Sequence, residues 1–325
     1  MIMIGVLGCG TIAYRHMRTL KSLQERFALE VTALSDTRRG ALNQALGIWP
    51  KARTYFNAKE LIACEDIDIL YICLPSYLHT EYAVLAMQRK IHLFIEKPVC
   101  LTSAEAQLLL EEQKQNNVFV AVGQVVRFFD EYEFLHDLIR TSKYGKLELL
   151  ILKRFCGITE KWFQDEEKSG SVVLDLHIHD VDFVRYTVGE PLIKRIAGRA
   201  NDTGMMTHII SDYTCGDTWI QAEGLWDISG AVPFEAGYHA YFEKASVIYN
   251  SISLKEPMVY EKNHIAKWKR GQTLRDPYQQ ENEYILSCFI EKKRPVRISL
   301  EEGIKSVKLC RKELSLAKQF INSKF

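Results

Sequence analysis

The chain has 325 residues, of which 47% are hydrophobic and 26% are charged. This balance is typical of a soluble globular protein and excludes disordered, collagenous and low-complexity classes. At roughly 150 residues per domain, the length predicts two domains, each large enough to bury its own core. The 42 basic and 41 acidic residues leave a net charge of +1. Such a chain has no global field to gather nucleic acid or an anionic membrane, so we expect a small-molecule partner.

The cysteines and the N-terminal residues indicate the cellular compartment of the protein. The eight cysteines contain no C-x-x-C pair, and we expect reduced core residues in a cytoplasmic protein. The longest run without a charged side chain, residues 1–14, is shorter than the roughly 20 residues of a membrane span. It lacks a basic start and contains Gly8 and Gly10. We therefore predict the first strand and turn of a domain there, rather than an export signal.

Short apolar runs alternate with helical patterns up to about residue 122. The runs have strand length and are mostly apolar on both faces, as strands of a parallel sheet are. They lie at residues 2–7, 31–34, 67–73, 92–95 and 118–122. Between them, Asn57 with Glu60 and Thr102 with Glu105 have the spacing of a capping box that starts a helix. The repeated pattern predicts an α/β domain over residues 1–122 with a doubly wound parallel sheet.

The pattern changes after Gly123. A helix is predicted near residues 129–141 and a strand near 147–155, and residues 191–262 hold short β-type stretches without a long helix between them. Two helices close the chain, one near 276–292 and an amphipathic one opened by Ser299. We therefore expect residues 123–325 to form an α+β domain with a largely antiparallel open sheet.

A glycine-rich motif follows the first predicted strand. Residues 8–13 read Gly-Cys-Gly-Thr-Ile-Ala, which is the G-x-G-x-x-A pattern of a dinucleotide-binding turn. In that pattern the first glycine makes the turn, the second lets the backbone approach a pyrophosphate, and the helix N-terminus offers free N–H groups to the phosphates. A glycine turn without a ligand is the alternative. The expected cofactor-binding residues here are Gly8, Gly10, Thr11, Ile12 and Ala13.

Asp36 ends the second predicted strand, 26 residues after Gly10. A carboxylate at this place can accept both ribose hydroxyls of adenosine and would repel a 2′-phosphate, which favours NAD. Arg38 follows at once and could pair with that phosphate, so NADP stays open. A solvated turn carboxylate is the alternative interpretation of Asp36.

Charged residues break an apolar strand at its C-terminal end in Glu96-Lys97-Pro98. Ligands of open α/β sheets bind outside those ends, so Lys97 is expected to face the cofactor. A lysine there can hydrogen-bond a substrate hydroxyl or carry a proton. On this segment alone, an ordinary loop lysine explains the pattern equally well.

A second charged motif lies in the other half of the chain. On a helix, Asp175, His179 and Asp182 would fall at i, i+4 and i+7 on one face. A histidine between two carboxylates can be held in one tautomer and stabilised when protonated, as a general base requires. His177 and His179 could instead form a metal pair, but no further ligand cluster accompanies them, and we expect no metal. A helix whose charged side chains simply face the solvent is the other alternative interpretation.

The motifs together resemble the Gfo/Idh/MocA family of NAD(P)-dependent dehydrogenases over nearly the whole chain. They are G-x-G-x-x-A, then E-K-P, then G-x-x-x-x-D-x-x-x-H, in this order. Residues 74–79 also resemble the family's P-N-x-x-H loop, and Arg127-Phe128 its R-F pair. The resemblance implies that Lys97, Asp175 and His179 form the catalytic group. The further expected cofactor-binding residues are Arg38, beside Asp36, and, in the motifs that carry the resemblance, Leu74, Pro75, His79, Glu96 and Lys97.

The resemblance also implies the larger organisation. The family has an N-terminal Rossmann domain, a C-terminal sheet domain that often builds a dimer or tetramer, and sugar or polyol substrates. This sequence departs from the pattern at Ser76, where the loop has Asn, and at residues 169–171, where a glycine cluster is usual. It also has His177 where a glycine is common between the catalytic Asp and His. That change adds a titratable side chain near the expected pocket.

We therefore expect an enzyme that oxidises a secondary alcohol of a sugar, polyol or related cyclic substrate and passes the hydride to the nicotinamide. His179 would take the hydroxyl proton, Lys97 would polarise the oxygen, and Asp175 would orient the substrate or His179. The expected substrate contacts are Arg127, Trp162, His177 and His179.

Two other functions stay open from the sequence. A non-catalytic, nucleotide-binding regulator of the same fold would keep the glycine turn without turnover. A methyltransferase that uses S-adenosylmethionine has a similar glycine motif, but Leu7 stands where that motif has an acidic residue.

Overall fold

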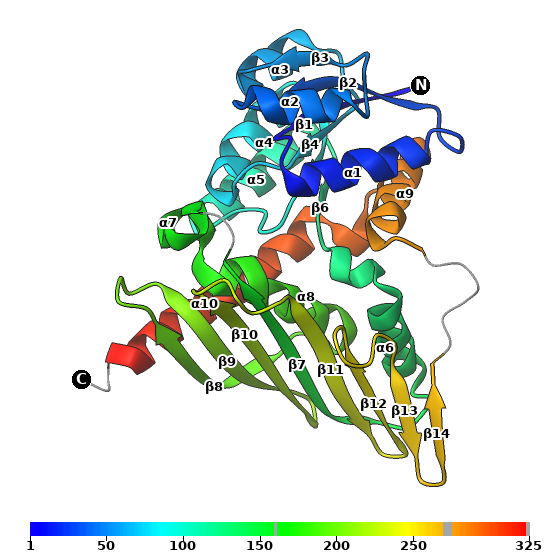
Figure 1. Ribbon diagram of the computed structural model, residues 1–325, viewed down its shortest axis with the longest axis vertical. Helices are drawn as coiled ribbons and strands as arrows, with labels where there is room; N and C mark the ends of the chain where they lie inside the picture. Colours follow the sequence, from blue (N-terminus) through cyan, green and yellow to red (C-terminus); the bar gives the residue numbers. More distant parts are fainter. Residues whose placement is uncertain (159–160, 269–274, 323–325) are drawn as a thin grey trace. The chain divides into compact units, whose positions relative to one another are not determined.

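The computed structural model describes residues 1–158, 161–268 and 275–322. The chain divides into two compact units (Figure 1). The first unit comprises Met1–Val125 and Arg275–Lys305, and the second comprises Val126–Leu274 and Ser306–Phe325. The single boundary expected between residues 122 and 123 differs from this division, because the chain returns to the first unit at residues 275–305.

The first unit contains a six-stranded parallel sheet with the order β3-β2-β1-β4-β5-β6. This order is that of a Rossmann fold, and its direction reverses between β1 and β4. The predicted doubly wound parallel sheet is therefore confirmed. Only β3, which is short and largely exposed, has no counterpart among the predicted strands. The strands are β1 (Ile2–Leu7), β2 (Leu29–Ser35), β3 (Arg53–Tyr55), β4 (Ile69–Ile72), β5 (His92–Ile95) and β6 (Val120–Val122).

Two helices of the first unit begin at the predicted residues. Thr102 forms the expected capping box, because its hydroxyl accepts from the N–H of Glu105 while the Glu105 carboxylate accepts from the N–H of Thr102. Asn57 caps its helix through the N–H of Lys59 at 2.9 Å. The helices of this unit are α1 (Thr11–Ser22), α2 (Arg39–Leu46), α3 (Ala58–Cys64), α4 (His79–Gln88), α5 (Ser103–Asn116) and α9 (Pro277–Ile290).

Helix α9 explains why residues 275–305 belong to the first unit. It packs on α1, and the buried Asn282 side chain joins several elements. Its Nδ2 donates to the hydroxyl of Thr19, at 2.6 Å, and its Oδ1 accepts from the hydroxyl of Tyr71, at 3.1 Å. These partners lie 263 and 211 positions away in the sequence, beyond the reach of any local pattern.

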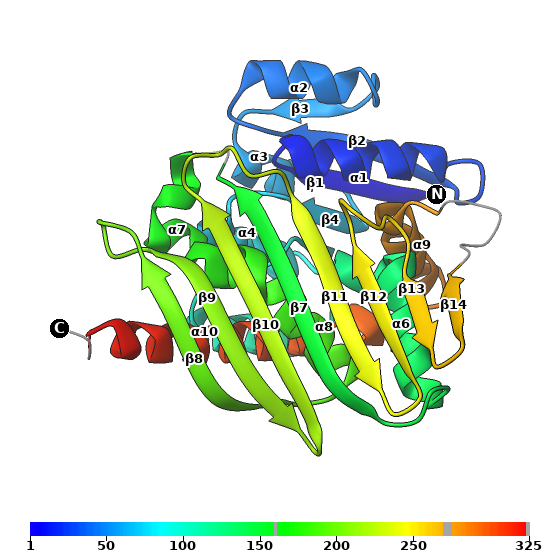
Figure 2. The same ribbon diagram turned by 60° about the horizontal axis from the view of Figure 1, so that its bottom comes forward.

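The second unit is built on an eight-stranded sheet with the order β14-β13-β12-β11-β7-β10-β9-β8 (Figure 2). Among the described strands of this sheet, only β7 and β10 pair in parallel, and the other neighbouring strands pair antiparallel. The expected largely antiparallel sheet is thus confirmed. The strands are β7 (Leu147–Gly157), β8 (Leu192–Ala200), β9 (Met206–Cys215), β10 (Thr218–Asp227), β11 (Glu235–Phe242), β12 (Ala245–Asn250), β13 (Met258–Glu261) and β14 (His264–Lys267).

Helices cover one face of this sheet. Alternate residues of the central strands, such as Leu150, Leu152 and Ala222, point to a core that also holds Leu135 of α6 and Phe183 of α8. The helices are α6 (Asp130–Thr141), α7 (Glu166–Ser169), α8 (Ile178–Thr187) and α10 (Leu300–Asn322), the last of which contains the boundary between the units. Among the helices within the described ranges, none has the length and apolar character needed to cross a membrane.

Candidate active site

Two glycines form the turn between β1 and α1. Gly8 has a φ of +82°, and a Cβ there would lie 2.5 Å from the carbonyl oxygen of Cys73. Glycine is therefore required at Gly8. At Gly10 the nearest atom to such a Cβ is the Nη2 of Arg38, 3.7 Å away. Gly10 also precedes α1 without any side-chain cap, so the first N–H groups of that helix are available to an anion.

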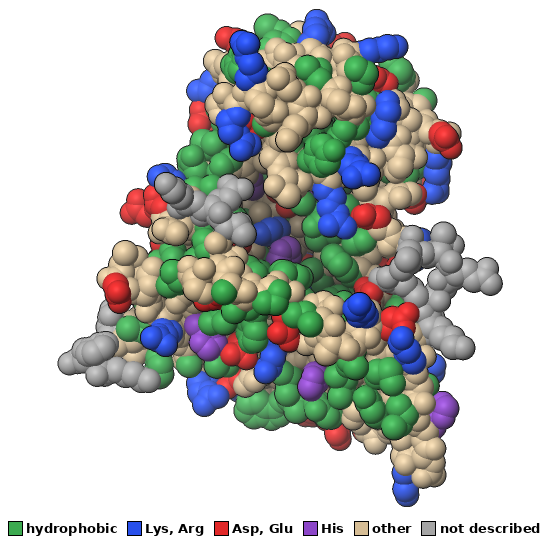
Figure 3. Space-filling model, in the orientation of Figure 1, with side chains coloured by type: hydrophobic (Ala, Val, Ile, Leu, Met, Phe, Trp, Pro, Cys, Tyr) green, Lys and Arg blue, Asp and Glu red, His purple; other side chains and the backbone are tan. Residues whose placement is uncertain are grey.

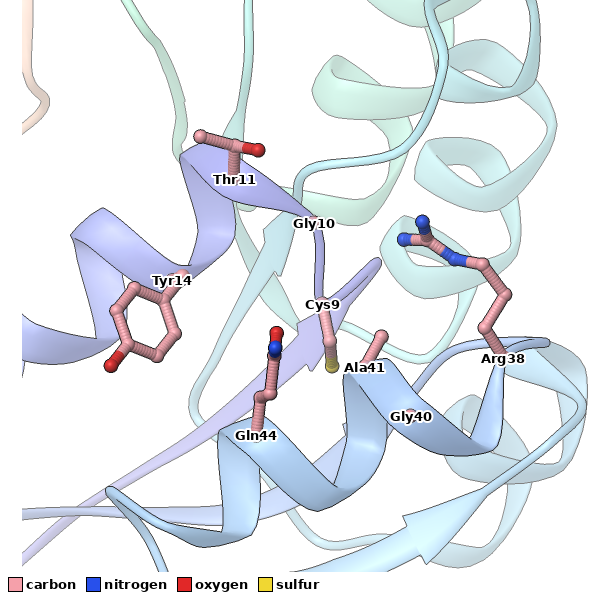
Figure 4. Close-up of a pocket in the computed structure, with 8 residues that line it drawn as sticks. All are labelled: Cys9, Gly10, Thr11, Tyr14, Arg38, Gly40, Ala41 and Gln44. Carbon is pink, nitrogen blue, oxygen red and sulfur yellow. The ribbon is translucent and has the colours of Figure 1, made fainter.

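An open pocket of about 680 Å³ lies beside this turn (Figure 4). Its size is that of small-molecule and cofactor sites. Together with the Gly8 turn and the uncapped helix start, the pocket fits the adenosine and phosphate part of a dinucleotide. Of the expected contacts nearby, Ala13 is fully buried, which is the packing role of this position. The lining residues are Cys9, Gly10, Thr11, Tyr14, Arg38, Gly40, Ala41 and Gln44.

Asp36 lies directly after β2, beside the same turn. Its Oδ2 accepts from the N–H of Cys9, and its Oδ1 accepts from the N–H of Arg38, both at 2.8 Å. Burial raises the pKa of Asp36, but the hydrogen bonds from Arg38 and Cys9 outweigh burial and lower it overall. The carboxylate is therefore ionised at neutral pH and held at the place that the sequence predicts.

Glu96 of the E-K-P segment is held from inside the unit. Its Oε1 lies 2.9 Å from the Nε2 of His16, and its Oε2 accepts from the N–H of Lys97 at 3.1 Å. Burial raises the pKa of Glu96, but the hydrogen bond and charge of His16, with the charge of Lys97, lower it overall. Glu96 therefore fixes the backbone of Lys97, while the Lys97 residue itself is partly exposed.

The loops after β4 and β5 are tied together by His79. Its Nε2 lies 2.8 Å from the carbonyl oxygen of Leu74, and its Nδ1 lies 2.8 Å from that of Pro98. His79 is buried, which argues against the expected direct contact with a cofactor and favours a positioning role. Leu74 packs beside the glycine turn, because its Cδ2 lies 3.3 Å from the Cβ position of Gly8. Pro75, the next residue, directly precedes a short 3₁₀ helix, Ser76–Leu78.

In the second unit, the D-x-x-x-H segment departs from a regular α-helix. Residues Val173–His177 form a π-helical turn that continues into α8, and such turns occur often at functional sites. Before it, Gly170 and Ser171 both have positive φ, +74° and +64°. A Cβ at Gly170 would lie 2.5 Å from the Cβ of Leu174, which explains why a glycine stands there.

The titratable residues of this segment differ in their exposure to solvent. Between residues 169 and 185, Asp175 and His179 are partly exposed and every other residue is buried. Asp182, expected on the same face, is buried and pairs with Arg127. Its two carboxylate oxygens lie 2.7 and 2.8 Å from the Nη2 and Nε of Arg127. The predicted three-residue face therefore reduces to Asp175 and His179.

Two expected substrate contacts, Arg127 and His177, are buried. Arg127 also lies over the ring of Tyr186, 4.5 Å from its centroid. The Nε2 of His177 lies 3.3 Å from the Ser211 hydroxyl and 3.5 Å from the carboxylate of Glu313. Both side chains are thus enclosed by protein, which argues against the expected contact with a substrate. Their apolar sequence neighbours are the signal that could have indicated burial.

Trp162, the remaining expected substrate contact, lies in a short 3₁₀ helix, Lys161–Gln164. Its ring stacks on Phe163, with 4.0 Å between centroids, and Phe163 meets the edge of Trp226. Trp162 is partly exposed, so it has a surface to offer to a ligand.

The fold and the glycine turn define a dinucleotide-binding Rossmann protein. Residues 2–124 match the family described as an oxidoreductase family with an NAD-binding Rossmann fold, Gfo/Idh/MocA. Over that segment the chain is similar to this family. The match confirms the resemblance seen in the sequence and NAD as the cofactor of the fold.

Curated relatives match part of the chain. It is 27% identical over 187 residues to a myo-inositol 2-dehydrogenase of Thermotoga maritima, covering 58% of this chain and 55% of the relative. It is 26% identical over 188 residues to an inositol 2-dehydrogenase of Salmonella typhimurium, covering 57% and 54%. The chain thus matches about half the length of these relatives.

Solved structures share the fold over nearly the whole chain. Levoglucosan dehydrogenase in complex with NADH has a TM-score of 0.86 at 13% identity, covering 98% of this chain and 97% of that one. The UDP-N-acetylglucosamine 3-dehydrogenase GnnA of Acidithiobacillus ferrooxidans has a TM-score of 0.81 at 20% identity, covering 98% of both chains. At these identities the likeness establishes the fold.

Proposed function

We propose that this protein is an NAD(P)-dependent dehydrogenase that oxidises a secondary alcohol of a sugar, polyol or related cyclic substrate. The observation that carries the proposal is the exposure pattern of residues 169–185, in which Asp175 and His179 alone reach the surface of a buried segment. A carboxylate and an imidazole kept available on an otherwise buried turn suit general base chemistry.

The first unit would hold the cofactor. Gly8 and Gly10 let the backbone approach the pyrophosphate, and the N–H groups at the start of α1, from Thr11 onward, would donate to its phosphates. Asp36 would accept the hydroxyls of the adenosine ribose. When bound, the cofactor supplies a nicotinamide ring that accepts the hydride.

The protein's own side chains would handle the proton. In this proposal, His179 takes the hydroxyl proton on a ring nitrogen, and the Nζ of Lys97 donates a hydrogen bond to the same oxygen. The Asp175 carboxylate orients the substrate or the imidazole. Trp162 offers an aromatic surface to the C–H groups of a sugar ring.

Relatives support the substrate class. Two of the matched proteins are named inositol 2-dehydrogenases, and solved structures of the same fold are named as dehydrogenases of levoglucosan and of a UDP-sugar. A ring with several hydroxyl groups is common to these names. We therefore include inositols, anhydrosugars and nucleotide sugars in the substrate class to be tested.

The test is a turnover assay over that panel with NAD and NADP, following the absorbance of the reduced nicotinamide. Lys97→Ala and His179→Ala are each expected to lower kcat by about 100-fold or more, because positioned proton transfer contributes that much. NADH affinity, measured by fluorescence, should change little. The matched controls are Lys59→Ala, an exposed lysine paired with Glu81, and His264→Ala, an exposed histidine of β14.

Two results would contradict this assignment. Full activity in both Lys97→Ala and His179→Ala would show that these residues do not carry the chemistry. NADH binding without turnover on any member of the panel would favour a nucleotide-binding regulator of the same fold.

We also propose that the protein forms a homodimer or homotetramer through the open face of the eight-stranded sheet. The register of β7 with β10 and β11 places a row of partly exposed apolar side chains on that face. Figure 3 shows hydrophobic side chains over these strands, interrupted by charged and histidine side chains. Such a patch is typical of a protein interface. The row includes Leu149, Ile151, Phe155, Leu225 and Tyr241.

Sedimentation velocity tests this second proposal. We expect a mass of two or four chains for the protein, and a shift toward one chain for Ile151→Lys at the centre of the row. A wild-type protein that sediments as a single chain at micromolar concentration would refute it.

A cytoplasmic location forms part of the same proposal. All eight cysteines are free thiols, as expected in a reducing compartment. Fractionation of the source cells, with immunodetection of the protein, would test this location, and recovery outside the cytoplasmic fraction would contradict it.

A further inference from the structure

The carboxylate of Asp36 has all its acceptor positions occupied. Its Oδ1 accepts from the N–H of Arg38 at 2.8 Å and from the Nε of Arg38 at 3.1 Å. Its Oδ2 accepts from the N–H of Cys9 at 2.8 Å and from the Nη2 of Arg38 at 3.2 Å. A carboxylate offers about four lone-pair positions. Asp36 therefore has no free position for the two hydroxyls of a ribose.

The four hydrogen bonds to Asp36 differ in whether a ligand could replace them without a change of the fold. The two from backbone N–H groups belong to the glycine turn and to the start of α2, and are part of the fold. The other two come from the guanidinium of Arg38, whose side chain is 66% exposed. Rotation of this one side chain would free one acceptor position on each oxygen of Asp36. Two adjacent acceptors are what a ribose diol requires.

The Arg38 guanidinium also reaches the glycine turn. Its Nη2 lies 3.7 Å from the Cβ position of Gly10, where the backbone is open to a pyrophosphate. Figure 4 shows the Arg38 side chain directed toward Gly10 at the edge of the pocket that both residues line. A dinucleotide that enters this pocket therefore meets the guanidinium.

We propose that Arg38 is a specificity-determining residue that competes with the adenosine ribose for Asp36. NAD binds only when its ribose replaces the guanidinium on Asp36, so Arg38 lowers NAD affinity. NADP gains a partner in Arg38, because the guanidinium can pair with the 2′-phosphate while it screens that phosphate from Asp36. The site consequently accepts both cofactors. This inference rests on the proposed function only in that the site binds a dinucleotide.

Arg39 provides a matched control. It is the next residue and carries the same charge, but its guanidinium lies over the ring of Phe56, 5.8 Å from the centroid. It makes none of the four hydrogen bonds to Asp36. Arg39→Ala therefore changes the charge near the pocket as Arg38→Ala does, without freeing Asp36.

The experiment measures dissociation constants of NADH and NADPH by fluorescence titration, at one ionic strength, for the wild type, Arg38→Ala and Arg39→Ala. Arg38→Ala should bind NADH about 3-fold more tightly, because an exposed ion pair no longer competes. It should bind NADPH about 10-fold more weakly or worse, because a charged hydrogen-bond partner of the phosphate is lost. Arg39→Ala should change both constants about equally and by less than these factors.

Calorimetric titration with ADP-ribose and its 2′-phosphate repeats the comparison on the adenosine half alone and requires no turnover. Weaker NADH binding by Arg38→Ala, or unchanged NADPH binding, would overturn the role of Arg38. Equal effects of Arg38→Ala and Arg39→Ala would show that only the general charge near the pocket matters. That result would also overturn the specific role of Arg38. A wild-type protein that binds neither cofactor would instead contradict the dinucleotide site, and with it the proposed function.

Discussion

Two buried carboxylates of the second unit, Asp180 and Asp182, differ from two of the first unit, Glu96 and Glu281, in the groups that balance their charge. In the second unit, Asp180 pairs with Arg154, 2.8 Å away, and Asp182 pairs with Arg127, 2.7 Å away. Each pair has a second hydrogen bond from the same guanidinium, which makes it bidentate. Arginine stays protonated at any pH at which the protein is folded. These charges are therefore compensated independently of pH.

Glu96 and Glu281 of the first unit, by contrast, accept no hydrogen bond from an arginine within the described residues. Glu96 faces His16, which is charged only when protonated. Neither carboxyl oxygen of Glu281 accepts a hydrogen bond from a side chain within the described residues, and burial raises the pKa of Glu281 well above its usual range. The contributions of Glu96 and Glu281 to stability should therefore depend on pH, whereas those of the two arginine pairs should not.

Arg127→Ala is expected to change stability more than the other variants proposed for this comparison. It leaves the carboxylate of Asp182 buried without its bidentate partner, and we expect a loss of about 3–5 kcal/mol in the free energy of unfolding. The loss should be similar at pH 6 and pH 8. Urea denaturation measures it. The control, Arg140→Ala, removes an exposed arginine that pairs with Asp137 and should cost about 0.5 kcal/mol or less.

His16→Ala tests the first unit. It removes the hydrogen bond to Glu96 and should cost about 1–3 kcal/mol at neutral pH, the penalty of an unsatisfied buried group. The lowered pKa of Glu96 contributes stability above the pKa of the unfolded chain, and this contribution disappears as the pH falls through the folded value. The difference between the variant and the wild type should therefore narrow toward pH 4. A difference that is constant with pH would mean that His16 acts only by packing.

Glu281→Gln should have the smallest effect, and it should be stabilising. Because the pKa of Glu281 is raised in the folded state, its burial lowers stability progressively as the pH rises above the unfolded value. A neutral amide avoids this cost. We expect a gain of about 1 kcal/mol at pH 8 that vanishes near pH 4. Thermal unfolding across this range measures it, and a loss of stability at pH 8 would show that the carboxylate is needed there.

Local sequence patterns predicted the elements whose causes are local. The bounds of β1, the capping box of Thr102 with Glu105 and the glycine turn at Gly8 and Gly10 all follow from short-range sterics and hydrogen bonding. The return of α9 to the first unit does not, because Asn282 reaches its partners across more than half of the chain. Long-range pairing of this kind leaves no periodic trace in one sequence.

The candidate site was predictable in its residue types but only partly in its geometry. Asp175 and His179 reach the surface, but Asp182, which lies in α8 together with His179, is buried in an ion pair with Arg127. His177 and Arg127 are enclosed by contacts from distant strands and helices. Their burial follows from tertiary packing, which overrides a pattern read along one helix.

The two glycines of the first turn separate folding from recognition. A Cβ at Gly8 would strike the backbone of the neighbouring strand end, whereas a Cβ at Gly10 would meet only the end of the Arg38 side chain. Substitution of Gly8 should therefore lower the yield of soluble protein. Substitution of Gly10 should instead leave a folded chain that binds the dinucleotide more weakly. A folded variant altered at Gly10 would thus test dinucleotide binding separately from folding.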